Sequence, residues 1–247
     1  MQPACPAKNS IIQQDYPHYI KYMGSKSKLM DFVIEGINEI HTGGAVCDLF
    51  AGSASLAGAI GNQVPVHAND IQHYSSVIAQ AYLMAWKSKD CPASTELIER
   101  ASDIVANNQK ALGLTVSYTE ARSLEAFNAI EKQQQALIDY TFRHPWHLFT
   151  KTYSGTWWSA EQCLWIDALR QVAENYKYLP VYPVILSSLM YAMAYTSQGT
   201  GHYAQYRDAK TQSSMRDILL YRKRELVPYF KRKYDEVFGS LASRKPT

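Results

Sequence analysis

Two acidic residues accompany short apolar runs, and their positions could bring both carboxylates to one ligand. Asp48 lies within the apolar segment 45–50, and Asp70 comes just after a second apolar segment, 64–68. Short apolar runs bounded by turn residues predict buried strands. The two acids are about 20 residues apart, the spacing at which an acidic residue at the end of the following strand reaches the ribose hydroxyls of a bound nucleotide.

A turn of small residues, 51–53, follows the first predicted strand and leads into a predicted helix rich in Ala and Leu. Such a strand–turn–helix junction places free backbone N–H groups at the helix N-terminus, where they suit a nucleoside or an anionic group. The dinucleotide pattern G-x-G-x-x-G is absent, because Gly52 is the only glycine between Asp48 and Ser53. The segment therefore favours an adenosine ligand without a pyrophosphate over NAD, with S-adenosyl-L-methionine as the main candidate.

Lys26 stands near the start of a helix predicted over 29–40, just after a turn at Gly24. The spacing does not fit the loop G-x-x-x-x-G-K-[ST], so binding of a nucleoside triphosphate is not expected. The helix dipole does not favour a lysine at a helix N-terminus. Lys26 is therefore interpreted either as a contact for a ligand carboxylate or as an exposed lysine.

The elements around these residues alternate as strand, helix, strand and helix, with the last helix over 74–86. This order predicts an α/β fold with a parallel sheet. From Cys91 onward the pattern is strand-poor and helical, and the expected helices are 96–112, 119–140, 160–176, 213–238 and, as a helix or buried segment, 184–195. Two strands are fewer than the five or six typical of a doubly wound sheet, so a partner is expected to supply the rest.

This division predicts three regions. They are an α/β portion for cofactor binding (1–90), a mainly helical insertion (91–212) and a basic helical C-terminal segment (213–247). Residues 207–247 hold 11 Lys and Arg against 5 Asp and Glu, which suggests a polyanionic partner or, alternatively, a solvated helix face.

The composition excludes several classes of protein. Of 247 residues, 47% are hydrophobic and 19% are charged, which indicates a globular rather than a disordered chain. The four cysteines form no C-x-x-C pair, so neither a metal site nor a disulfide framework is expected, and a reducing cytoplasm is favoured. No apolar segment is long enough to span a bilayer, and the N-terminus lacks an apolar signal core.

Three motifs, in order, carry a family resemblance. They are KYMGSK at 21–26, DLFAGS at 48–53 and the pair ND at 69–70. Together they resemble the opening motifs of the D12 class (Dam-like, group α) of adenine-N6 DNA methyltransferases. The resemblance implies a Rossmann-like methyltransferase sheet that binds S-adenosyl-L-methionine, and a chain that methylates adenine in double-stranded DNA, as in restriction-modification.

The resemblance also assigns roles to individual residues. It implies that Tyr22 and Lys26 help to bind the cofactor, with Lys26 facing its methionine carboxylate. Asp48, Phe50 and Gly52 would line the floor of the pocket, with Phe50 near the adenine. Asp70 would accept hydrogen bonds from the ribose hydroxyls. A core Phe50, a turn glycine and a capping aspartate are the structural alternatives.

The region for target recognition is expected in the helical insertion and in the polar, aromatic segment 199–207, which resembles the family's segment that meets DNA. Aromatic rings and cations there offer stacking faces and phosphate contacts. With the basic segment that follows, the expected DNA-binding residues are Tyr203, Tyr206, Arg207, Arg222 and Lys223.

The chain departs from the family at the catalytic motif. Adenine-N6 methylation in this family uses a loop [DNS]-P-P-[YFW], and no such tetrapeptide occurs in these 247 residues. Catalytic residues are therefore not expected in this chain. Three interpretations stay open. In the first, the chain is the cofactor-binding and recognition part of a split or truncated enzyme, with the loop on a second subunit or in a missing C-terminal half. In the second, it is an inactive DNA-binding or regulatory module. In the third, it is an unrelated nucleoside-binding protein.

Overall fold

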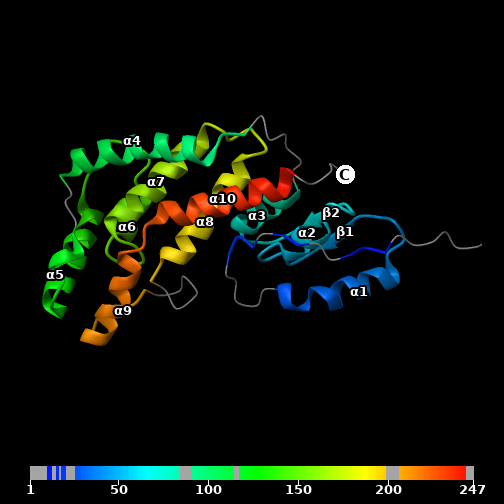
Figure 1. Ribbon diagram of the computed structural model, residues 1–247, viewed down its shortest axis with the longest axis horizontal. Coiled ribbons are helices and arrows are strands. Elements are labelled where there is room, and N and C mark those ends of the chain that lie inside the picture. Colours follow the sequence, from blue (N-terminus) through cyan, green and yellow to red (C-terminus); the bar gives the residue numbers. More distant parts are fainter. Residues whose placement is uncertain are drawn as a thin grey trace, which may run out of the picture.

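Two short parallel strands and a larger set of helices make up the computed structural model (Figure 1). The structure describes residues 10–12, 15–16, 18–20, 26–83, 91–113, 117–198 and 206–242. Strand β1 (Val46–Asp48) pairs in parallel with β2 (Val66–Ala68), and Asp48 lies opposite Ala68. The predicted parallel pair is confirmed, and within the described residues the sheet has these two strands only.

The helices of the α/β portion follow the predicted order. They are the 3₁₀ helix η1 (Lys26–Leu29), α1 (Met30–Ile40), α2 (Ser55–Ile60) and α3 (His73–Leu83). Apolar side chains of α1 and α2 form a buried cluster that includes Met30, Ile34 and Ile60. Val46 and Val66, which are paired across the strands, pack against this cluster. It holds the strand pair against the helices.

The opposite face of the strand pair is open. Cys47 and His67 form the central pair of the register, and both are exposed. Parallel sheets are normally covered on both faces, so this small sheet is open where a larger one would be buried. The coarse prediction of an α/β arrangement is met only in part: the fold is mostly helical, and a Rossmann-like sheet stays a prediction.

The remaining helices form the larger part of the molecule. They are α4 (Ser94–Leu112), η3 (Tyr118–Glu120), α5 (Leu124–Gln135), η4 (Ala136–Asp139), α6 (Leu148–Tyr153), α7 (Ala160–Glu174), α8 (Tyr182–Thr196), α9 (Gln212–Arg222) and α10 (Leu226–Ala242). Their main core joins α3, α4, α7, α8 and α10 in one apolar cluster. The cluster therefore includes residues from all three predicted regions, 1–90, 91–212 and 213–247, and this division of the chain stays a prediction.

The single helix predicted over 213–238 is wrong, because α9 ends at Arg222 and α10 begins at Leu226. Pro228 explains the break: it has no N–H for the carbonyl of Arg224, and its ring would clash with that carbonyl in a continuous helix. The side-chain amide of Gln162 instead donates to the carbonyls of Tyr221 (2.8 Å) and Arg224 (2.7 Å). The proline therefore starts a new helix, and α7 satisfies the carbonyls that the break leaves free.

Across the helices that the structure describes, none combines the length and the apolar composition that crossing a membrane requires.

Candidate functional site

Lys26 and Asp48 meet at the carboxyl end of β1, although they are far apart in the sequence. The Lys26 ammonium donates to Asp48 Oδ1 at 2.5 Å and to the main-chain oxygen of Phe50 at 2.8 Å. The Lys26 side chain is 37% exposed and that of Asp48 is 6% exposed. Because an ammonium has three N–H donors, Lys26 keeps one donor on the solvent side for a further acceptor.

The second carboxylate oxygen of Asp48 is the most unusual atom of this region. Asp48 Oδ2 is buried and has no hydrogen-bond partner. A buried acceptor left unpaired costs free energy, on the order of 1–3 kcal/mol. An orphaned carboxylate oxygen at a strand end is therefore a feature that a donor on a ligand would satisfy.

Asp70 closes the same edge from β2. Its Oδ2 accepts the N–H of Gly52 at 2.8 Å, and its Oδ1 accepts the N–H of Gln72 at 2.9 Å. The bonds from Gln72 and from Gly52 lower the pKa of the Asp70 carboxyl. The prediction of free N–H groups in this turn is wrong for Gly52, because Asp70 already accepts that hydrogen. The bond ties the turn after β1 to the end of β2.

Phe50 lies beside these groups but is 79% exposed, so the alternative of a core phenylalanine is wrong. A large exposed ring next to a buried carboxylate is available to stack on a flat ligand. Leu49 beside it is 59% exposed. Tyr22, the other aromatic residue expected at the cofactor, lies outside the described residues.

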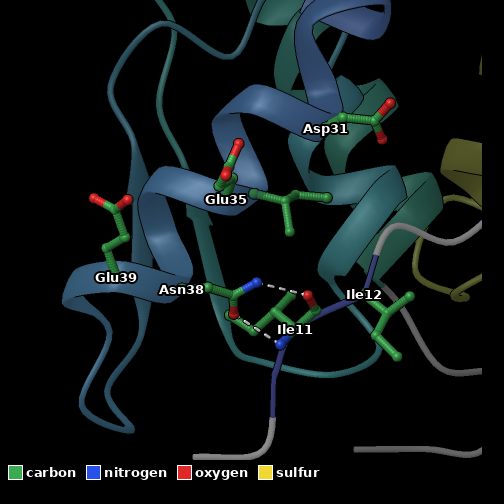
Figure 2. A pocket seen from close by; sticks show the side chains of 7 residues that line it. Ile11, Ile12, Asp31, Glu35, Asn38 and Glu39 are labelled. Atoms are coloured by element: carbon green, nitrogen blue, oxygen red, sulfur yellow. Dashed lines mark hydrogen bonds between the residues drawn. The ribbon is translucent and has the colours of Figure 1, made fainter.

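A separate hollow of about 580 Å³ lies on α1 and the stretch before it (Figure 2). Asn38 fixes that stretch, because its side chain bonds both the N–H (2.8 Å) and the carbonyl (2.9 Å) of Ile11. The hollow is lined by Ile11, Ile12, Asp31, Ile34, Glu35, Asn38 and Glu39. It contains none of the residues expected at the cofactor, so the strand ends and this hollow are different places.

Arg207 and Tyr206 are held at one edge of the helical region. The Tyr206 ring packs edge-on against Trp157 with 5.1 Å between centroids, and Arg207 pairs with Asp217 at 2.7 Å. The buried Gln198 fixes the backbone of Arg207: its amide accepts the Arg207 N–H (3.3 Å) and donates to the Arg207 carbonyl (3.0 Å). Arg207 and Tyr206 are both half-buried, which leaves part of each side chain accessible.

Arg222 has the opposite environment. Its guanidinium is fully buried and binds Glu131, with Nη2 at 2.5 Å and Nε at 3.0 Å from the carboxylate oxygens. Nη2 also donates to the carbonyl of Thr156, and Tyr118 donates to Glu131. Burial alone would lower the pKa of Arg222, but the bonds and charge of Glu131 raise it. A phosphate cannot reach this side chain, so the expected DNA contact of Arg222 is corrected to a structural ion pair.

Of the other expected DNA contacts, Lys223 caps the C-terminus of α9 and is exposed, and Tyr203 lies outside the described residues. Two residues with structural roles were absent from the sequence interpretation. Glu131 and Gln198 are both buried polar residues that bind elements remote in the chain. No local pattern marks either one, since their partners are brought by the fold. Among the described residues, no group of three or more His, Cys, Asp and Glu side chains could hold a metal ion.

Comparison with known families identifies the family of the chain. The family model described as D12 class N6 adenine-specific DNA methyltransferase matches residues 22–224. The match covers most of the chain, which therefore belongs to this family of DNA methyltransferases. No curated protein and no solved structure matches the chain.

Proposed function

We propose that the chain binds S-adenosylmethionine at the carboxyl ends of β1 and β2 and forms the cofactor-binding and target-recognition part of a site-specific adenine-N6 DNA methyltransferase. The observation that carries the proposal is the buried Asp48 Oδ2, which lacks a donor. The methionine part of the cofactor carries an ammonium group, which is such a donor, and a carboxylate that suits the remaining N–H of Lys26. The residues present therefore fit this cofactor.

The other strand-end residues supply complementary contacts. Each carboxylate oxygen of Asp70 accepts one backbone N–H. Because a carboxylate oxygen has two lone pairs, both oxygens can still accept hydrogen bonds from ribose hydroxyls. The exposed Phe50 offers a flat face to the adenine. When bound, the cofactor supplies an activated methyl group. The chain's own residues orient it and hold its two charged ends.

For the DNA, the proposed contacts are Tyr206, Arg207 and Lys223, with Tyr203 from the sequence interpretation. Arg207 and Lys223 would contact phosphates, which position a protein on DNA, while the aromatic rings can stack on bases. The expected Arg222 contact is not part of the proposal, because that guanidinium is fully buried.

The proposed enzyme takes its catalytic loop from outside these 247 residues, on a second polypeptide or on a further segment of the same one. These 247 residues contain no [DNS]-P-P-[YFW] segment to accept hydrogen bonds from the adenine amino group and to stack on the flipped base. The open face and edges of the two-stranded sheet are consistent with completion by further strands. A role in restriction-modification fits an enzyme of this type.

Methyl transfer tests the proposal. The purified chain is incubated with radiolabelled S-adenosylmethionine and duplex DNA, alone and with a second polypeptide that carries a proline-pair loop. We expect no transfer by the chain alone and transfer to adenine N6 with the second chain. Transfer by the chain alone would refute the proposal that the catalytic loop lies outside these residues. Cofactor and DNA binding without transfer in any combination would support an inactive recognition module instead.

A further inference from the structure

A line of tyrosine rings and basic side chains runs along the contact between α8 and α10. Tyr191 and Tyr195 lie one helical turn apart on α8, with ring centroids 4.4 Å apart. The Tyr195 ring stacks on Tyr229 of α10 at 5.7 Å and an interplanar angle of 22°. Arg232, one turn further along α10, lies over both Tyr229 (5.4 Å) and Tyr191 (5.7 Å). We call this set of side chains the α8–α10 ridge; it comprises Tyr191, Tyr195, Tyr229, Arg232 and Arg224.

The end of the ridge near α9 carries Arg224. Its guanidinium stacks on the ring of Tyr221 at 4.1 Å and donates to the carbonyl of Tyr195 at 2.7 Å. The other end carries Lys233, whose ammonium lies 4.4 Å from the centroid of Tyr191. In Figure 1, α10 leads away from α9 toward α3, so the ridge runs from the α9 side of the helical region toward α3 of the α/β portion.

The two arginines of the ridge differ from several paired arginines and lysines of the fold. Lys26, Arg100, Arg207 and Arg222 each have a carboxylate partner within 4 Å, as do Lys231 and Lys233 on α10 itself. Within the described part of the chain, Arg224 and Arg232 pair with no carboxylate; they contact tyrosine rings, a carbonyl and a phenol oxygen. Neither guanidinium therefore has a carboxylate within 4 Å among the described residues.

Both guanidiniums also keep hydrogen-bond donors for a ligand. Arg232 donates once, from Nη2 to the Tyr191 hydroxyl at 2.7 Å, and Arg224 once, to Tyr195. A guanidinium has five N–H groups in a planar fork that matches phosphate oxygens. Stacking on tyrosine reduces the mobility of each arginine, so less conformational entropy is lost when a further bond forms. Arg232 is exposed and Arg224 is half-buried, so a ligand can reach both.

From these observations we infer that the α8–α10 ridge binds the phosphodiester backbone of the DNA substrate, with Arg224 and Arg232 as its phosphate contacts. The inference rests on the proposed function and extends its DNA contacts along the molecule. Arg224 lies in the break before α10 and Arg232 lies on α10, and both donate to α8, to Tyr195 and Tyr191 respectively.

The test compares single and double substitutions by the salt dependence of binding. A fluorescent duplex of about 25 base pairs is titrated with wild type, Arg224→Gln, Arg232→Gln and the double variant at several salt concentrations. Each lost phosphate contact should reduce the slope of log affinity against log salt by about 0.9. The double variant should bind several-fold more weakly at low salt.

Three controls keep the result interpretable. Arg100→Gln removes an exposed arginine that is already paired with Glu96, so its slope should equal that of wild type. Arg232→Lys retains the charge and should retain the slope. Thermal unfolding identifies any variant that fails to fold.

A double variant that folds and keeps the wild-type slope would overturn the ridge assignment alone. A wild-type chain that binds cofactor but no duplex would overturn the ridge and the DNA part of the proposed function, while cofactor binding measured separately would still stand. A chain that binds duplex through the ridge but no cofactor would support the ridge and refute the proposed cofactor site.

Discussion

Two ion pairs of this chain look alike as contacts but differ in how far solvent reaches them. Lys26 and Asp48 meet at the end of a strand, where one carboxylate oxygen has no partner and the lysine is 37% exposed. In the pair formed by Arg222 and Glu131, both carboxylate oxygens accept hydrogen bonds and the guanidinium has no exposed surface. The sequence interpretation assigned both cations to ligands, and only Lys26 stands where a ligand can reach it.

The difference shows how a binding pair is told from a structural one. Each pair leaves one buried polar atom without a partner, Oδ2 of Asp48 and Nη1 of Arg222, so an unpaired atom alone does not mark a binding site. The pair of Lys26 and Asp48 differs because the lysine is partly exposed and keeps a donor that a ligand can reach.

The largest effect is expected for Glu131→Ala. It leaves the fully buried Arg222 without its carboxylate and Tyr118 without its acceptor. Removing one partner of a buried pair costs about 3–5 kcal/mol, which urea unfolding would measure. The control is Arg216→Ala, which changes an exposed residue of α9, the helix that also carries Arg222. It should change stability by less than about 0.5 kcal/mol. A cost below about 1 kcal/mol for Glu131→Ala would mean that the pair contributes no more than a surface one.

A smaller cost is expected for Gly155→Ala, next to the same pair. Gly155 has φ +70°, and an added Cβ would lie 2.4 Å from the carbonyl oxygen of Glu131. Left-handed backbone costs an alanine about 1–2 kcal/mol, and the clash should bring the total to about 2–4 kcal/mol. Gly113→Ala is a matched control, since it has φ +61° and open space around the new Cβ. Equal losses of stability in the two variants would show that packing at Glu131 is not tight.

The smallest effect concerns pH and the turn after β1. Hydrogen bonds from Gln72 and Gly52 lower the pKa of Asp70 in the folded protein. A depressed folded pKa means that the stabilisation is present above the unfolded value of about 3.9 and is lost as the pH falls through the folded pKa. Asp70→Asn should therefore show a weaker decline of melting temperature below about pH 4 than wild type. Identical acid profiles would contradict a stabilising role of these bonds.

Local patterns predicted the two strands, their parallel pairing and the side chains at their ends. Residues 45–50 and 64–68 are short apolar runs bounded by turns. Asp48 lies in the first run and Asp70 just after the second, so parallel pairing of the strands brings them to the same edge. The break between α9 and α10 could also have been predicted, because Pro228 cannot continue a helix from Arg224.

The burial of Arg222 could not be predicted in the same way. Its partner Glu131 lies 91 residues away in the sequence, and nothing near Arg222 distinguishes it from the exposed Lys223 that follows. The same holds for Gln198, whose amide joins the carbonyls of Thr156 and Arg207. Residues of this kind acquire their roles only from tertiary packing, which brings distant segments together.

Calorimetric titration of S-adenosylmethionine into wild type and Asp48→Asn tests the central claim most directly. Asparagine keeps the size of the side chain but replaces one carboxylate oxygen with a donor. The substitution should therefore weaken binding by about 10- to 100-fold, the value of a hydrogen bond to a charged group, and thermal unfolding measures separately what the weakened pair with Lys26 costs in stability. Equal affinity in the two proteins, or no binding by a folded wild type, would contradict a cofactor site at the ends of β1 and β2.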